Sequence, residues 1–107
     1  MAFNVVTIDE TCPVCANPIR RRVQFKYGEL RAHEYELGDV LRWGVNEEGV
    51  PAKLVLVEGV PEECPACGDD PEWVYEIVIR DNVIESATRG TTDPFAEADN
   101  NYIIVEP

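Results

Sequence analysis

The sequence predicts a mainly β fold, a small antiparallel sheet domain with one short helical turn. Apolar residues alternate with polar ones over several segments, which is the pattern of strands with one buried face. Turn-forming residues separate these segments, and one stretch carries a helix start signal. The chain of 107 residues has the length of one domain, so we expect residues 1–107 to fold as a single unit.

Seven segments have the composition and alternation of strands. In chain order they are residues 3–8, 21–27, 31–37, 52–58, 72–80, 83–89 and 102–105. Residues 40–43 form either a further short strand or an extended connection, and residues 46–51 form a polar loop. Together these segments indicate six or seven short strands in a mainly antiparallel sheet.

The second and third segments are expected to form a hairpin through a turn at Gly28-Glu29. Alternation places two sets of side chains on common faces of this hairpin: Val23, Phe25 and Tyr27, and then His33, Tyr35 and Leu37. Gly38-Asp39 ends the pattern.

The C-terminal third carries a second hairpin signal and the helix signal. Asp81-Asn82 is a plausible two-residue turn between segments five and six, although it lacks the glycine that such turns favour. Residues 93–98 begin with Asp93 as a helix N-cap and Pro94 at the first helical position. We therefore expect one turn of helix before the last strand.

The formal net charge of −12 is unevenly distributed along the chain. Residues 1–53 hold seven Lys or Arg and eight Asp or Glu, whereas residues 54–107 hold two and thirteen. The acidic second half should repel nucleic acid and anionic membranes. Such a surface keeps a protein in solution or meets a basic protein partner, and the unlike halves permit a weak self-association.

Four cysteines carry the chemistry of this sequence. They form two Cys-Pro-x-Cys pairs and are the only cysteines in the chain: Cys12, Cys15, Cys64 and Cys67. A spacing of two residues makes a tight turn whose sulfurs can bind one ion, and four soft ligands suit tetrahedral zinc. With four protein ligands, such a site stabilises the fold and does not activate water. A thiol–disulfide pair would instead need a helix after the cysteines, which the strand-rich surroundings oppose.

These paired knuckles resemble the zinc ribbon family, in which Cys-Pro-x-Cys-Gly turns lie at the tips of β-hairpins. The second knuckle, residues 64–68, matches that motif in full, whereas the first has Ala16 where the family has glycine. The resemblance implies one structural zinc ion bound by the four cysteines. It implies no particular activity, because zinc ribbons serve many functions.

Two alternative functions remain open at this point. Rubredoxin holds iron with two Cys-x-x-Cys pairs and is small and acidic, so electron transfer through iron is the first alternative. This chain is longer and lacks the aromatic residue that follows the first rubredoxin knuckle, which favours zinc. The second is a nucleic-acid-associated zinc ribbon that uses the segment from Arg20 to Arg31. On a strand these arginines would instead alternate faces, pair with carboxylates and shield the anionic metal site.

No active-site motif is present, so we expect no enzymatic activity. His33, the single histidine, shares a face with Tyr35 and is expected to be packed or at the surface. Trp43 and Trp73 are expected at the core or its edge, and an exposed Trp43 would mark a partner surface.

The sequence favours a cytoplasmic protein. No run of about 18 apolar residues exists, which excludes a membrane-spanning helix. The first residues lack the basic start and long apolar stretch of a signal peptide. Cysteines stay reduced in the cytoplasm, which is consistent with metal binding.

Overall fold

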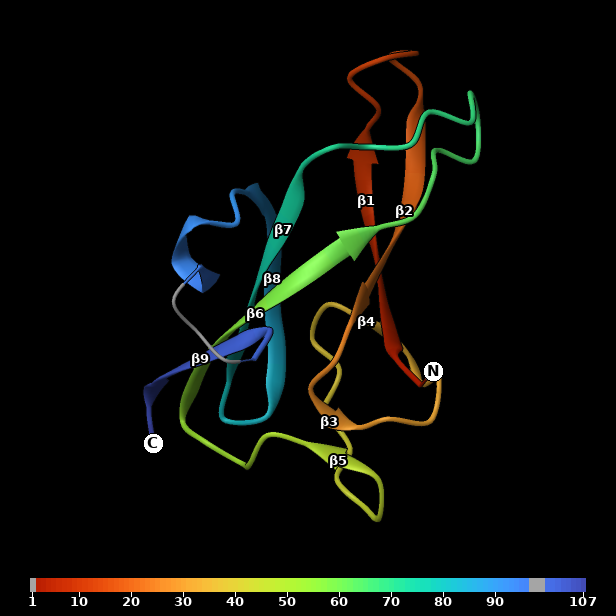
Figure 1. The fold of residues 1–107 in the computed structure, drawn as a ribbon. Helices are drawn as coiled ribbons and strands as arrows, with labels where there is room; N and C mark the ends of the chain where they lie inside the picture. Colours follow the sequence, from red (N-terminus) through yellow and green to blue (C-terminus); the bar gives the residue numbers. More distant parts are fainter. Residues whose placement is uncertain (1, 97–99) are drawn as a thin grey trace.

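A computed structural model describes residues 2–96 and 100–107, and these residues are mainly β, as predicted. Figure 1 shows the strands and the single 3-10 turn. Their bounds are β1 Asn4–Thr11, β2 Pro18–Phe25, β3 Gly28–Glu29, β4 Glu34–Glu36, β5 Glu47–Glu48, β6 Leu54–Pro61, β7 Val74–Arg80, β8 Val83–Gly90, η1 Asp93–Phe95 and β9 Tyr102–Glu106.

Seven of these strands form one curled sheet in the order β4-β1-β2-β6-β7-β8, and β9 also pairs with β6. β6 connects the two halves of the sheet. The first half of β6 pairs with β9 and its last residues pair with β2 along the same edge, while β7 occupies the other edge. Since β2 meets β6 only at Val23 and Gln24, the β1–β2 hairpin continues beyond the end of β6 (Figure 1).

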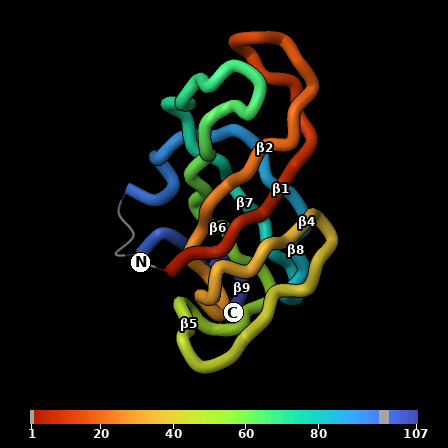
Figure 2. Tube along the Cα trace, turned by 90° about the vertical axis from the view of Figure 1, so that its right-hand side faces the viewer, coloured from red at the N-terminus to blue at the C-terminus, as the bar shows by residue number. Residues whose placement is uncertain are grey.

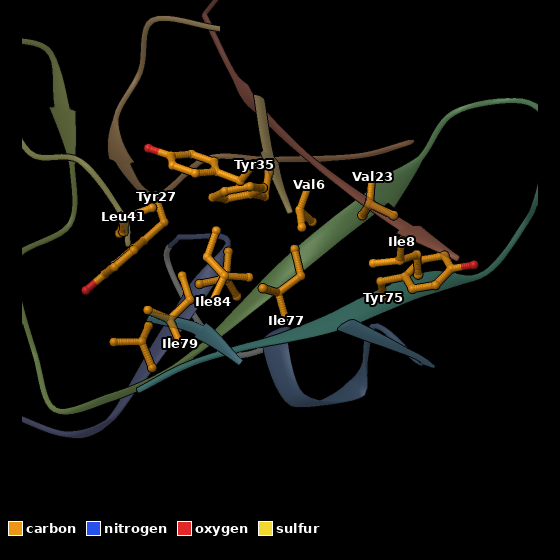
Figure 3. Packing of buried hydrophobic residues seen from close by; sticks show 13 residues of the cluster. Val6, Ile8, Val23, Tyr27, Tyr35, Leu41, Tyr75, Ile77, Ile79 and Ile84 are labelled. Atoms are coloured by element: carbon orange, nitrogen blue, oxygen red, sulfur yellow. The ribbon is translucent and has the colours of Figure 1, made fainter. Parts of the chain in front are cut away.

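The main core lies between the two halves of the curled sheet. Figure 3 shows Val6 and Val23 on one side of this core and Ile77 and Ile84 on the other. Thirteen buried apolar residues form it: Val6, Ile8, Val23, Phe25, Tyr27, Tyr35, Leu41, Val55, Val57, Tyr75, Ile77, Ile79 and Ile84. Strict alternation in the strands produces this core, since buried and more exposed residues alternate along β2, β6 and β7.

Gly59 allows β2 and β7 to pack closely across β6. A Cβ atom at this position would lie 2.5 Å from Val23 Cγ1 and 2.9 Å from Ile77 Cδ1. Both distances are shorter than a carbon–carbon van der Waals contact, so any larger residue would push the two halves of the core apart.

The predicted hairpin between residues 21–27 and 31–37 is wrong. β4 pairs in parallel with β1, and β2 pairs with β1 and β6 instead. Between them, Gly28-Glu29 forms β3, which pairs with β5. The segment expected as a polar loop, residues 46–51, therefore contributes a short strand.

Asn4 provides the physical reason for this difference. Its buried side-chain amide donates to the carbonyls of Tyr27 and Glu29, at 3.1 and 3.0 Å, and its oxygen accepts from the amide of His33. These bonds satisfy the backbone groups that a hairpin would have paired, and they hold the returning chain beside β1. Leu37, predicted on the core face, is 45% exposed because the chain turns away after β4.

The second predicted hairpin is confirmed, since β7 and β8 pair antiparallel. Asp81 and Asn82 have φ values of 50° and 65°, the left-handed conformation that a two-residue turn of this kind requires. The helix signal yields only η1, and its N-cap is Thr92 rather than the predicted Asp93. Residues 97 and 98 of the predicted turn lie outside the described residues. No helix within the described ranges is long and apolar enough to cross a membrane.

Replacing Ile77 with alanine should lower the free energy of unfolding by about 2–5 kcal/mol, since Ile77 is fully buried in the main core. Val78→Ala is the matched control, because its side chain lies on the opposite, half-buried face of the same strand. Urea unfolding followed by tryptophan fluorescence measures both variants. Equal losses would contradict the placement of the core.

Candidate metal centre

The two cysteine knuckles lie together at one end of the molecule. The first, residues 12–16, closes the β1–β2 hairpin, and the second, residues 64–68, lies in the connection from β6 to β7. Figures 1 and 2 show both loops side by side beyond the end of the sheet. Segments about 50 residues apart in the chain thus meet, as the sequence predicted for a shared metal site.

Both knuckles have the same backbone hydrogen bonds. In the first, the amide of Cys12 donates to the carbonyl of Asn17 over 3.0 Å, and the amide of Ala16 donates to the carbonyl of Cys12 over 2.8 Å. The second repeats both bonds at 2.8 Å through Cys64, Gly68 and Asp69. The two halves of the site are therefore equivalent turns.

The residue four positions after the first cysteine of each knuckle has a left-handed backbone conformation. Gly68 has a φ of 78°, and Ala16 takes the corresponding conformation with a φ of 61°. The departure of the first knuckle from the glycine motif therefore changes the residue and not the geometry. An L-residue pays a conformational cost there that glycine does not.

The four sulfur atoms lie within 4.8 Å of one another. The Cys12 and Cys67 sulfurs are 4.0 Å apart, those of Cys15 and Cys64 are 3.9 Å apart, and all four thiols are free. A tetrahedral zinc ion with Zn–S bonds of about 2.3 Å places its sulfurs about 3.8 Å apart. The cluster therefore fits a metal ion, and these separations are too long for a disulfide.

The surroundings of the sulfurs divide them by proton affinity. The backbone amide of Cys15 lowers the pKa of Cys12 to about 6, and the amide of Cys67, 3.5 Å from the Cys64 sulfur, lowers the pKa of Cys64. At Cys67 the amide of Asp69 also acts to lower the pKa, but burial and the neighbouring sulfurs outweigh it and raise the pKa to about 12. Four thiolates so close together need a cation to balance their charge.

The sulfur cluster has its own small core. Cys12 and Cys64 are buried with Ile19, Cys15 packs partly buried against them, and Cys67 is exposed. None of these residues belongs to the main core. The sulfur cluster is thus a separate packing unit in which Cys67 is exposed.

Arg21 lies beneath this unit and is completely buried. Its Nε atom donates to Glu10 over 2.8 Å, and its Nη1 atom donates to the carbonyl of Glu62 over 2.9 Å. The other Glu10 oxygen accepts from the hydroxyl of Tyr75 over 2.6 Å. Arg89 stacks on Trp73 beside this pair, with its guanidinium carbon 4.9 Å from the ring centre.

These contacts join the two arms that carry the knuckles, which are the β1–β2 hairpin and the connection from β6 to β7. Glu10 lies at the end of β1, just before the first knuckle, and Glu62 precedes the second. Glu62 also receives hydrogen bonds from the side chains of Arg22 and Gln24, and its amide donates to the carbonyl of Arg22. Arg21 and Glu62 therefore fix the position of one knuckle relative to the other.

The three consecutive arginines alternate faces, as the structural interpretation of the sequence predicted. Arg20 and Arg22 point outward, and each pairs with two carboxylates. Arg20 contacts Asp9 and Glu36, while Arg22 contacts Glu34 and Glu62. Arg21 points inward with Ile19, Val23 and Phe25.

The other candidate residues lie away from the sulfurs. His33 is mostly buried, and its Nε2 atom is 2.8 Å from a carboxylate oxygen of Glu29. This contact lowers the pKa of Glu29. Trp43 is half-buried at the core edge, where its indole N–H donates to Asn82 over 3.0 Å. As the sequence predicted, Trp73 also packs against the main core.

Sequence reasoning missed the buried pair of Arg21 and Glu10. The alternation along β2 could have indicated the buried position of Arg21, because Arg21, Val23 and Phe25 are alternate residues and therefore lie on the same face of the strand. The first segment was also expected to end at Ile8, three residues before β1 ends, which left Glu10 outside the sheet. Comparisons with protein-family models, curated proteins and solved structures gave no match.

Replacing Ala16 with glycine should raise the free energy of unfolding by up to about 1 kcal/mol, because glycine removes the left-handed strain. The reverse change, Gly68→Ala, should lower it by about 1–2 kcal/mol. Thermal unfolding of metal-loaded protein measures both. Ala66→Gly is the control, since Ala66 lacks a positive φ, and an equal gain there would refute the role of conformation.

Replacing Arg21 with alanine should weaken metal binding about tenfold or more, because the two knuckles lose their common anchor. Competition with a chromophoric chelator measures the affinity. Arg20→Ala removes an exposed arginine from the same strand and should change the affinity little. If both variants bind metal like the unchanged protein, Arg21 does not position the knuckles.

Proposed function

We propose that this protein is a small zinc-binding protein of the zinc ribbon type, in which Cys12, Cys15, Cys64 and Cys67 hold one structural zinc ion. The observation that carries this proposal is the gathering of four sulfurs within 4.8 Å of one another. All four are contributed by two equivalent turns, as expected for paired knuckles. A bound zinc ion would supply the positive charge that the four thiolates require.

The proposed role is that of a non-catalytic interaction module for a protein partner. Four cysteine ligands leave no coordination position for water or substrate, so the metal would stabilise the arms and take no part in chemistry. The surroundings support this role, because Arg21 and Glu10 satisfy each other's charge inside the protein. The pairing of Arg20 and Arg22 with carboxylates also favours an acidic protein module over a nucleic-acid-binding one.

Protein purified without added metal should contain one zinc ion per chain by elemental analysis, and Cys64→Ser should lose it. Iron with visible charge-transfer absorption would replace this proposal with electron transfer. Absence of any metal, together with failure of the apoprotein to bind Zn²⁺ or Co²⁺, would overturn it. Ser86→Ala, in β8, is a control substitution and should keep the metal.

Removal of the metal with a chelator should leave the main sheet folded, since the thirteen-residue core contains none of the sulfurs. We expect the β signal in far-UV circular dichroism to remain while amide exchange accelerates in residues 11–18 and 62–69. Complete unfolding on metal removal would show instead that the sheet depends on the metal.

A further inference from the structure

The edge of β1 is only partly covered. β4 pairs with Val5, Val6 and Thr7, but β1 continues to Thr11. Beyond Glu36 the chain turns away, and its next segment joins β8 instead, where the amide of Gly38 donates to the carbonyl of Ile84. The last four residues of β1 therefore have β2 on one side and no strand on the other among the described residues.

The backbone groups on this edge can be assigned from the pairing. The amide of Val5 donates to His33 on the β4 side, so odd-numbered residues of β1 direct their backbone groups toward that side. Cys12 confirms the alternation, because its amide points into the β1–β2 hairpin. The N–H and C=O of Asp9 and the N–H of Thr11 thus face the open edge without a backbone partner in the described chain.

Arg89 supports this assignment. Its Nη2 atom donates to the carbonyl of Thr11 over 3.1 Å, which places that carbonyl on the open side of β1. A side chain from β8, and not a strand, therefore reaches this part of the edge. Three backbone groups in a row remain available for an extended chain.

Two hollows lie on the β1–β2 hairpin next to this edge. One hollow of about 480 Å³ is lined by Asp9, Thr11, Pro18 and Arg20, among others. A second hollow of about 170 Å³ is lined by Asp9, Arg20 and Leu37, among others. Because both include Asp9 and Arg20, the two hollows adjoin each other on the hairpin, beside the open backbone groups of β1.

The charged side chains beside this edge indicate what kind of chain would bind there. The side chains of Asp9 and Glu36 are 80% and 59% exposed, and the single cation between them, Arg20, already pairs with both. The whole chain carries a formal charge of −12. A second copy would place another Asp9 and Glu36 against this edge, so like charges disfavour self-pairing and a basic segment fits better.

We propose that residues 8–11 of β1 bind an extended, basic segment of a partner protein, which adds to the sheet as a strand in line with β4. This inference rests on the proposed role as an interaction module and names its surface. The hydrogen bonds would come from Asp9 and Thr11, and the carboxylates of Asp9 and Glu36 would attract Lys or Arg side chains.

A pair of substitutions at one position tests the edge. Asp9→Pro removes the open N–H and should leave the pairing with β2 intact, because that N–H points away from β2. Asp9→Ala is the matched control, since it loses the same carboxylate but keeps the N–H. The probe is a phage-displayed library of random 12-residue peptides, selected on the zinc-loaded protein, and enriched sequences are then synthesised and titrated by fluorescence anisotropy.

The enriched peptides should be basic, and Asp9→Pro should weaken them about tenfold more than Asp9→Ala does. Exchange of the Thr11 amide should slow at least tenfold when peptide is bound. Failure to enrich peptides, equal binding by both variants, or protection of Thr11 only at high protein concentration without peptide would each overturn the proposal. The last result would assign the edge to a second copy of the chain.

Metal content measured on the same samples separates the two proposals. If peptides bind Asp9→Pro as well as Asp9→Ala while every sample holds one zinc ion, the edge proposal fails and the structural zinc site stands. If the unchanged protein holds no zinc, the proposed metal site fails whatever the peptides do. Retention of zinc by Asp9→Pro also shows that this variant is folded at the knuckle end.

Discussion

The buried guanidinium of Arg21 is the constraint on which the end of the molecule that carries the four cysteines depends. A buried charge is costly unless it is paired and hydrogen-bonded, so the surrounding chain must supply partners at fixed positions. Glu10 supplies a carboxylate from β1, and Glu62 supplies a carbonyl from the end of the second arm. Tyr75 then holds Glu10 from a third strand. Pairing the Nε and Nη1 atoms of one arginine thus brings together the three segments that carry or support the knuckles, while its buried Nη2 atom has no hydrogen-bond partner in the described chain.

This arrangement separates two stabilising elements within a small chain. The main core buries apolar residues from both halves of the sheet, whereas the sulfur cluster buries only Cys12, Ile19 and Cys64. On the β1–β2 hairpin, which contributes residues to both the main core and the sulfur cluster, Glu10 and Arg21 lie between the residues of the two. A metal ion would therefore bind to knuckles that the protein already holds in position, which lowers the conformational entropy cost of binding.

Much of the site and part of the fold could be predicted from the sequence, because they depend on local patterns. Each Cys-Pro-x-Cys turn brings its own two sulfurs together locally, and the alternation of residues 72–80 and 83–89 specifies a hairpin directly. The path of residues 27–37 could not be predicted in this way. It depends on Asn4, a residue more than 20 positions away whose amide bonds replace the expected pairing. Alternation shows which face is buried but does not show which strand lies alongside.

The arginines illustrate the same limit at the surface and explain the charge that a partner would meet. Read as a run, Arg20–Arg22 is a basic patch; folded, it is one internal ion pair and two exposed clusters with carboxylates in excess. Residues 54–79 contain no Lys or Arg, so the second knuckle has no cation of its own. Four thiolates with one zinc ion would add two further negative charges. The cations of the first half are therefore largely used within the fold, and the field around the knuckle end and the β1 edge is negative, which favours the approach of a basic chain.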